Sequence, residues 1–167
     1  MFTRATACSF TGHRPEKLPW GEEERDPRCL AVKEQLKAAL DRAYDRGYTH
    51  FICGMARGSD LYFAQAVLAL RDRCPEVTLE CARPCESQTD GWGEAARERY
   101  EAILDRCDYE TLVQHGYTRG CMMRRNRYMV DRSSHIISIY DGMPSGGTAA
   151  TLAYALRQGL TTDIIQL

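Results

Sequence analysis

The chain has 167 residues and a mass of 19.0 kDa, and its 22 basic and 23 acidic side chains give a formal charge of −1. This length fits one domain, and the near-neutral charge argues against sequence-independent binding of long nucleic acids. No apolar stretch reaches the roughly 18 residues needed to cross a membrane, and residues 1–10 lack the hydrophobic core of a signal peptide, so we expect a cytoplasmic protein without membrane association.

Strand-like and helix-like hydrophobic patterns alternate along the chain, which predicts a three-layer α/β/α fold around a mainly parallel sheet. The expected strands, in chain order, are 5–10, 49–53, 77–82, 110–113, 135–140 and 163–166. The expected helices are 30–46, 59–73, 92–106, 120–132 and 148–158, and a loop is expected at 11–28. No repeat or linker divides the sequence, so residues 1–167 are expected to form a single domain.

The eight cysteines are spread along the chain, and no pair has the C-x-x-C spacing of a zinc or redox site. Cys81 and Cys85 could join His115 or Cys121 around a metal, but isolated cysteines of this kind are more often buried reduced thiols. We therefore expect no metal site.

Five polar segments follow expected strands, at residues 11–15, 54–60, 85–92, 122–127 and 141–148. Right-handed crossovers place the carboxyl ends of parallel strands at one edge of a sheet, so these segments are expected to meet there. Their glycines allow close backbone approach, and helix N-termini favour anions. Basic residues outnumber acidic ones in these turns, with Arg14, Arg57, Arg124, Arg125 and Arg127 against Asp60 and Asp141. The pattern predicts a basic pocket for a small phosphate-bearing ligand.

Each segment also has a purely structural interpretation. Gly146 and Gly147 could form a simple turn, Asp60 could cap a helix, and Trp92 could belong to the core. Arg124 and Arg125 could lie on a solvated surface. Convergence of five segments at one edge favours a ligand site.

Three motifs resemble the SLOG superfamily, over almost the whole chain: residues 53–60 (CGMARGSD), 125–131 (RNRYMVD) and 145–148 (SGGT). Residues 11–15 (TGHRP), with Gln88 and Trp92, are similar to YpsA-like members in particular. The resemblance implies a single Rossmann-like domain. It also implies a nucleotide-derived ligand, such as ADP-ribose or NAD, in the same pocket.

Two related groups imply other functions. Lonely Guy phosphoribohydrolases pair an arginine with a glutamate; Arg125 matches the arginine, but Thr151 stands at the glutamate position, so we assign no catalytic residue. Asp60, Asp131 or Asp141 could replace that carboxylate from other loops. The resemblance to DprA implies single-stranded DNA binding through Arg57, Arg125 and Arg127, but this chain lacks the extra domains and basic charge of such proteins.

The hypothesis from the sequence is therefore a sensor or ligand-binding module for a small anionic nucleotide, associated as a homo-oligomer through its helices. Backbone around five residues would hold phosphate, namely Gly54, Gly58, Gly146, Gly147 and Thr148. Arg125, with Arg57 or Arg14, would neutralise it, and Asp60 or Asp141 would bind ribose hydroxyls. The remaining candidates for ligand contact are Gly12, His13, Gln88, Trp92 and Asn126.

Overall fold

The computed structural model describes residues 2–167, so residue 1 of the expected domain lies outside the described part. The strands are β1 (Ala7–Gly12), β2 (His50–Cys53), β3 (Thr78–Arg83), β4 (Tyr109–Leu112), β5 (His135–Tyr140) and β6 (Thr161–Gln166). The helices are α1 (Pro27–Asp45), α2 (Ser59–Arg73), α3 (Glu94–Arg106), α4 (Cys121–Asp131) and α5 (Gly147–Arg157), with short 3-10 helices at Arg4–Thr6 and Pro15–Lys17.

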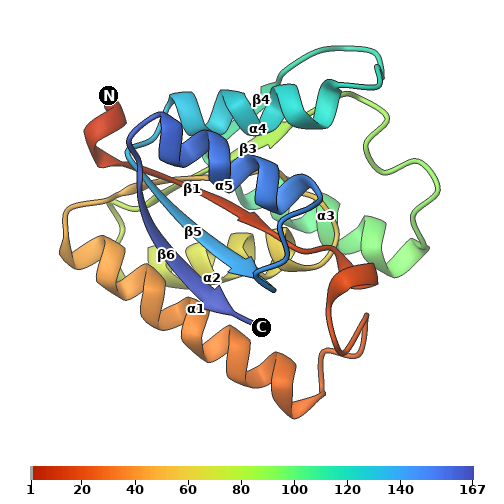
Figure 1. The fold of residues 1–167 in the computed structure, drawn as a ribbon, viewed down its shortest axis with the longest axis horizontal. Helices are drawn as coiled ribbons and strands as arrows, with labels where there is room; N and C mark the ends of the chain where they lie inside the picture. The colour runs from red at the N-terminus through yellow and green to blue at the C-terminus, as the bar shows by residue number, and fades with distance from the viewer. Residues whose placement is uncertain (1) are drawn as a thin grey trace.

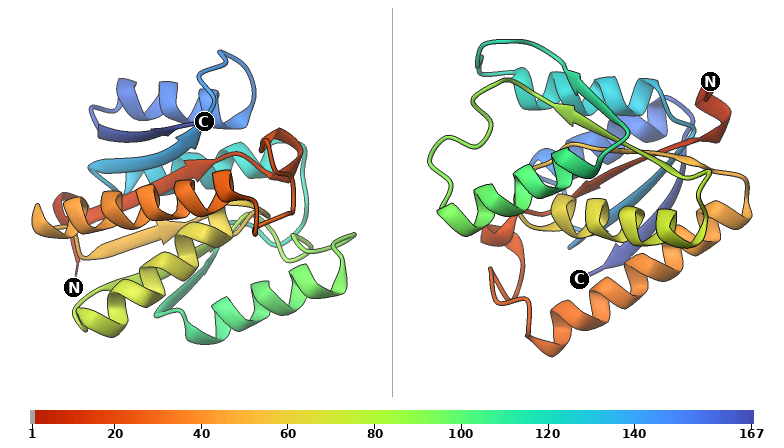
Figure 2. Two further views of the ribbon diagram at one scale, coloured as in Figure 1. Left: turned by 90° about the horizontal axis from the view of Figure 1, so that it is seen from below. Right: turned by 180° about the vertical axis from the view of Figure 1, so that it is seen from behind.

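All six strands are parallel and form one sheet in the order β4-β3-β2-β1-β5-β6 (Figure 1). Helices α1, α2 and α3 cover one face, and α4 and α5 cover the other (Figure 2). The predicted three-layer, Rossmann-like α/β architecture is thereby confirmed. None of the described helices is both long enough and apolar enough to cross a membrane.

The core lies mainly between the sheet and the helices α1 and α2. Phe10 of β1 stacks on Phe63 of α2 with ring centroids 4.6 Å apart, and Phe51 of β2 packs edge-on against the same ring. The predicted apolar stripe of α1 is buried, with Leu36 and Leu40 at its centre. Strands covered on both faces bury nearly every residue, as β1 and β5 do.

Several boundaries differ from the sequence prediction, and β1 runs two residues later than expected, so that Thr11 and Gly12 belong to the strand. Helix α1 begins at Pro27, because Asp26 accepts a hydrogen bond from the Arg28 N–H (2.8 Å) and proline is favoured in the first turn. Helix α3 begins at Glu94, which leaves Trp92 in the preceding turn. Strand β6 begins at Thr161, which is paired with His135 of β5.

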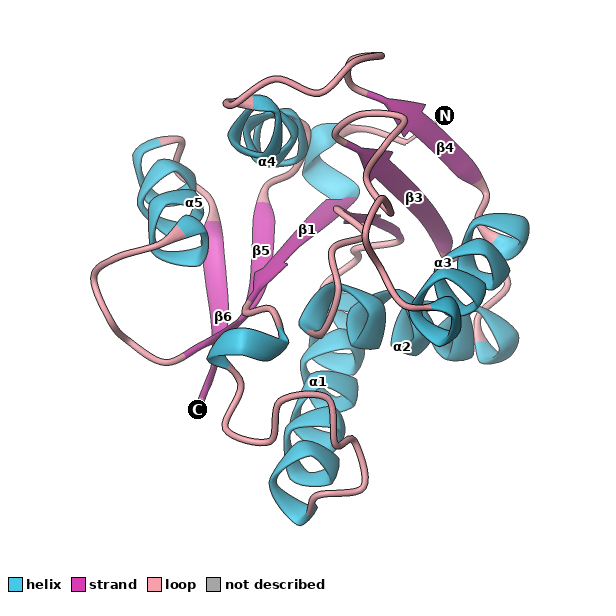
Figure 3. Cartoon of the chain, turned by 90° about the vertical axis from the view of Figure 1, so that its right-hand side faces the viewer, coloured by secondary structure: helices cyan, strands magenta, loops and turns pink. Residues whose placement is uncertain are grey.

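The order of strands reverses at β1. Connections from β1 through β4 move outward in one direction, whereas β5 and β6 lie on the other side of β1. In open α/β sheets ligands bind at the carboxyl edge beside such a reversal. Figure 3 views the molecule from this edge, with the turn after β1 and the starts of α4 and α5 facing the viewer.

Candidate functional site

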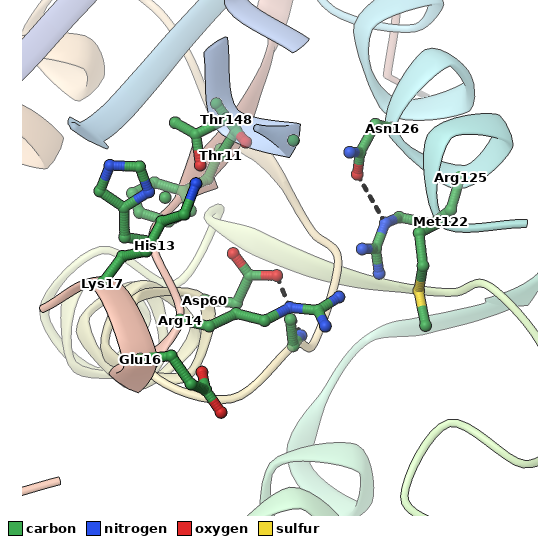
Figure 4. A pocket seen from close by; sticks show the side chains of 14 residues that line it. Thr11, His13, Arg14, Glu16, Lys17, Asp60, Met122, Arg125, Asn126 and Thr148 are labelled. Atoms are coloured by element: carbon green, nitrogen blue, oxygen red, sulfur yellow. Dashed lines mark hydrogen bonds between the residues drawn. The ribbon is translucent and has the colours of Figure 1, made fainter. Parts of the chain in front are cut away.

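A pocket of about 340 Å³ opens beside the reversal point (Figure 4). It is bounded by the end of β1 and the 3-10 helix that follows, by the start of α2, and by the first turns of α4 and α5. The lining residues are Phe10, Thr11, Gly12, His13, Arg14, Glu16, Lys17, Ala56, Asp60, Met122, Arg125, Asn126, Gly147 and Thr148. Four of the five predicted segments contribute residues to this lining, and residues 85–92 do not.

Two threonines that line this pocket have hydroxyl groups without a hydrogen-bond partner among the described residues. Thr11 lies at the end of β1 and Thr148 in the first turn of α5, and each is only 6% exposed. Within residues 2–167, neither hydroxyl has a hydrogen-bond partner, although both line the pocket. Buried polar side chains are normally paired, so these two hydroxyls have hydrogen-bonding capacity left for a ligand or water.

Arg125 forms the buried cationic wall of the pocket and is 3% exposed. Its Nε donates to Asn126 Oδ1 at 2.8 Å, and one terminal nitrogen donates to the carbonyl oxygen of Gly54. The other terminal nitrogen has no partner within the described residues. Burial lowers the pKa of Arg125 below its usual value, while nearby Asp60 acts in the opposite direction.

The position of Arg125 depends on the absence of a side chain at Gly54. A Cβ atom at Gly54 would lie 2.7 Å from Arg125 Cζ, which is inside the closest approach of two carbon atoms. Gly54 thus contributes to the pocket by admitting the guanidinium group, although it does not line the pocket itself. This is the close backbone approach for which glycine is required.

Asp60 brings a carboxyl group to the same pocket and is 6% exposed. Its Oδ2 accepts a hydrogen bond from the Ala56 N–H at 2.9 Å, and Oδ1 has no partner within residues 2–167. Burial raises the pKa of Asp60, and the charge of Arg125, the Ala56 N–H and the charge of Arg14 only partly oppose this effect. Asp60 is therefore an acceptor that takes up a proton more readily than an exposed aspartate.

The 3-10 helix after β1 brings Arg14, Glu16 and Lys17 to the pocket, where the sequence had predicted only Arg14 of these three. The turn is compact because Pro15 occupies its first position, and the Lys17 N–H donates to the Arg14 carbonyl oxygen at 3.0 Å. In the sequence, Pro15 could have indicated this turn, because proline is favoured at the first position of a helix.

The first turn of α5 presents free backbone N–H groups to the pocket. The first N–H groups of a helix have no partner within the helix, and together with the helix dipole they attract anions. Gly147 and Thr148 of this turn line the pocket. Gly146 precedes them at φ +94°, and Lys17 Nζ lies so close that a Cβ at Gly146 would collide with it.

His13 and Asp141 form a pair at the rim. His13 lines the pocket, and its Nε2 lies 3.0 Å from Asp141 Oδ1. A hydrogen bond from the Ser59 hydroxyl to the His13 carbonyl oxygen (2.7 Å) fixes this turn against α2. The Met143 N–H and the His13 side chain hold the pKa of Asp141 below its usual value. Asp141 itself does not line the pocket.

Three other predicted residues lie beside the pocket. Arg57, Gln88 and Trp92 line a neighbouring cavity of about 60 Å³, together with Arg14, Ala56 and Met122. Arg57 forms ion pairs with Glu16 and Glu22.

Gln88 donates to the Gly54 carbonyl oxygen at 2.9 Å and accepts from the Tyr100 hydroxyl at 2.8 Å, so its amide supports the loop after β2. Gly58 packs against Pro15 and is also outside the pocket lining.

The expectation that Arg124 and Arg127 add charge to this pocket is wrong. Both line a separate groove beside β4, where Arg124 donates to Gln114 Oε1 at 3.1 Å and Arg127 lies over the Tyr154 ring. Helical periodicity explains the difference, because residues adjacent to Arg125 on α4 point to other faces of that helix. Met122, one turn earlier on α4, also lines the pocket.

Thr151 has a structural role at the position where related phosphoribohydrolases carry a glutamate. It is fully buried, donates to the Gly147 carbonyl oxygen at 2.8 Å and accepts from Asn126 Nδ2 at 2.9 Å. Of the three aspartates considered as replacements, Asp60 lines the pocket, Asp141 pairs with His13, and Asp131 accepts from the Tyr154 hydroxyl on another face.

Comparison with known proteins finds one matching family model, YpsA, described as the YspA SLOG family, over residues 8–166. The UPF0398 protein YpsA of Bacillus subtilis is 26% identical over 150 residues, covering 88% of this chain and 82% of the relative. A UPF0398 protein of Bacillus velezensis is 27% identical over 150 residues, covering 88% and 81%. One from Bacillus pumilus is 23% identical over 135 residues, covering 80% and 72%. These names state no ligand or reaction.

Proposed function

Because the chain belongs to the YpsA SLOG family, we propose that its pocket binds a small phosphate-bearing, nucleotide-derived ligand and that the protein is a sensor or ligand-binding module. One observation carries the proposal. Polar atoms from four elements open into one pocket without a hydrogen-bond partner among the described residues: the hydroxyls of Thr11 and Thr148, Asp60 Oδ1 and one Arg125 nitrogen. They offer donors and acceptors from several sides, which favours a polar ligand.

The phosphate of this ligand lies at the first turn of α5. There it accepts hydrogen bonds from the free N–H groups and from the Thr148 hydroxyl, and the helix dipole adds favourable electrostatics. Arg14 and Lys17, at the 3-10 helix after β1, supply further positive charge. Three cationic side chains around a pocket of about 340 Å³ suit a compact anion better than an extended nucleic acid strand.

The ribose lies toward Asp60, where an unpaired carboxylate oxygen accepts hydrogen bonds from hydroxyl groups. Arg125 then donates its free nitrogen to the same part of the ligand. This arrangement satisfies polar groups from both walls at once. It also explains why a carboxylate remains in a pocket that otherwise attracts anions.

Calorimetric titration with AMP, ADP-ribose and NAD tests the proposal, with adenosine as the ligand that lacks phosphate. We expect a phosphorylated ligand to bind with Kd below about 1 mM and adenosine to bind more weakly. Arg125→Ala is expected to weaken binding by at least about tenfold, whereas Arg124→Ala, one residue away on another face of α4, leaves it unchanged. If no phosphorylated ligand binds below that limit, the proposal is wrong.

A second candidate function is hydrolysis of a nucleoside monophosphate to free base and ribose phosphate, and Asp60 is the observation that favours it. Its pKa is raised by burial and its Oδ1 opens to the pocket, as a proton-transferring group requires. Incubation with the common nucleoside monophosphates would then release base, and Asp60→Asn would abolish release while nucleotide binding remained. Binding without release of base by the unmodified protein would eliminate this candidate.

A further inference from the structure

Lys17 has an unusual place in the pocket, because it is a cation beside the positive end of a helix. Its Nζ is packed against Gly146, immediately before the first turn of α5. It has no hydrogen bond or ion pair within residues 2–167. Asp141 attracts it at longer range but is already bonded to His13 and to the Met143 N–H.

A lysine ammonium beside a helix N-terminus is electrostatically unfavourable, since both carry positive charge. An anion bound between them attracts both the ammonium group and the helix N-terminus. The Thr148 hydroxyl independently indicates this position, because it is nine-tenths buried, unpaired and directed into the same pocket as the ammonium group (Figure 4). Gly146 allows the arrangement because it has no side chain to displace Lys17.

We propose that Lys17 and the α5 N-terminus together bind a terminal phosphate, so that the ligand is a phosphomonoester and not a pyrophosphate-bridged dinucleotide. This inference rests on the proposed function and narrows its ligand class. Lys17 Nζ lies against Gly146 at the start of α5, beside the position of that phosphate. A terminal phosphate brings close to two negative charges to the ammonium group, whereas each phosphate of a pyrophosphate bridge carries only about one.

The test compares ribose 5-phosphate, AMP and NAD by calorimetry on the full chain, with Lys17→Met as the variant. Methionine keeps an unbranched apolar side chain and removes the charge. Lys37→Met is the matched control, because Lys37 is exposed on α1 and outside the pocket lining. Circular dichroism melting of all three proteins verifies that each is folded.

We expect the unmodified protein to bind AMP more tightly than NAD, and Lys17→Met to weaken AMP and ribose 5-phosphate by about tenfold. NAD binding should weaken less in this variant, because each bridging phosphate carries less charge, so the preference for AMP falls, whereas Lys37→Met leaves both affinities unchanged. NAD binding as tight as AMP, or an equal effect of Lys17→Met on both ligands, overturns this inference and leaves the proposed function standing. Absence of binding by every phosphate overturns both.

Discussion

Two regions of the molecule bury titratable side chains, and they differ in how completely those side chains are paired. At the amino ends of β2 and β3, His50 and Glu80 are almost fully buried and 2.8 Å apart. Thr111 and Tyr128 donate to the second Glu80 oxygen at 2.9 and 2.7 Å. His50 Nδ1 lies 2.7 Å from the Thr78 hydroxyl, and the Phe2 ring stacks on the imidazole.

The pocket at the carboxyl edge is equally polar but leaves groups unpaired. The pKa values of Glu80 and Asp60 are shifted in opposite directions. Burial raises the pKa of Glu80, but the hydrogen bonds from His50, Tyr128 and Thr111 outweigh it and hold the pKa below the usual 4.5. For Asp60, burial outweighs the opposing charges and the pKa is raised. Burial of a charged group therefore does not by itself mark a ligand site; at the carboxyl-edge pocket it occurs together with polar atoms that have no partner among the described residues.

The largest expected effect comes from Glu80→Leu, which leaves His50, Thr111 and Tyr128 without their acceptor. Removing one member of a buried pair costs about 3 kcal/mol of unfolding free energy, measured by guanidinium denaturation. Affinity for AMP should be unchanged, because Glu80 does not line the ligand pocket. A loss below about 1 kcal/mol would mean that the hydrogen bonds among His50, Glu80, Thr111 and Tyr128 contribute little to stability.

Gly54→Ala should have the next largest effect and act on the ligand pocket. The added Cβ forces Arg125 out of position, which costs about 2 kcal/mol of stability as overpacking and also weakens AMP binding. In the background of Arg125→Ala the same change should cost much less, since the clash is gone. A double-mutant cycle of denaturation midpoints measures this coupling, and additive effects would contradict it.

A matched pair of threonine substitutions gives the sharpest test of the comparison. Thr111→Val removes a hydrogen bond to the ionised Glu80 and should cost about 1.5 kcal/mol of stability. Thr148→Val removes an unpaired hydroxyl and should leave the stability of the free protein unchanged or slightly higher, while AMP affinity falls by about fivefold. Equal losses of stability from the two changes would show that the regions do not differ in pairing.

The smallest expected effect concerns pH. Because the pKa of Glu80 is lowered on folding, its ionised form stabilises the protein above its usual pKa of 4.5, and this contribution disappears as the pH falls below that value. The stability difference between the unmodified protein and Glu80→Gln should be about 1 kcal/mol at pH 7 and should shrink below pH 4.5. Denaturation curves at pH 7, 4.5 and 3 measure it, and a difference that is independent of pH would contradict the assignment.

Much of the fold could be predicted because parallel strands have a strong local signal. The run His135–Tyr140 is apolar on both faces, as a strand between two layers of helices must be. The α1 stripe from Val32 to Ala43 is equally clear. The start of α1 was predicted too late, because Asp26 and Pro27 act as a cap inside a segment that is otherwise polar.

The site was predicted in part, because topology fixes which loops meet but not which side chains face inward. Arg125 and Thr148 were identified from their motifs, and both line the pocket. Lys17 was missed, because its place follows from a single turn of 3-10 helix. Arg127 was placed wrongly, because the helical phase of α4 is not evident from an arginine-rich run.

The close packing of Gly54 and Arg125 has an evolutionary consequence. A relative with a larger residue in place of this glycine has no room for the guanidinium in its present position, so we expect such a change to accompany a change at the arginine. Joint retention of the pair in a family member would therefore indicate, from sequence alone, that the same close packing is preserved. Members that have replaced both have been released from that constraint and are free to have acquired another role.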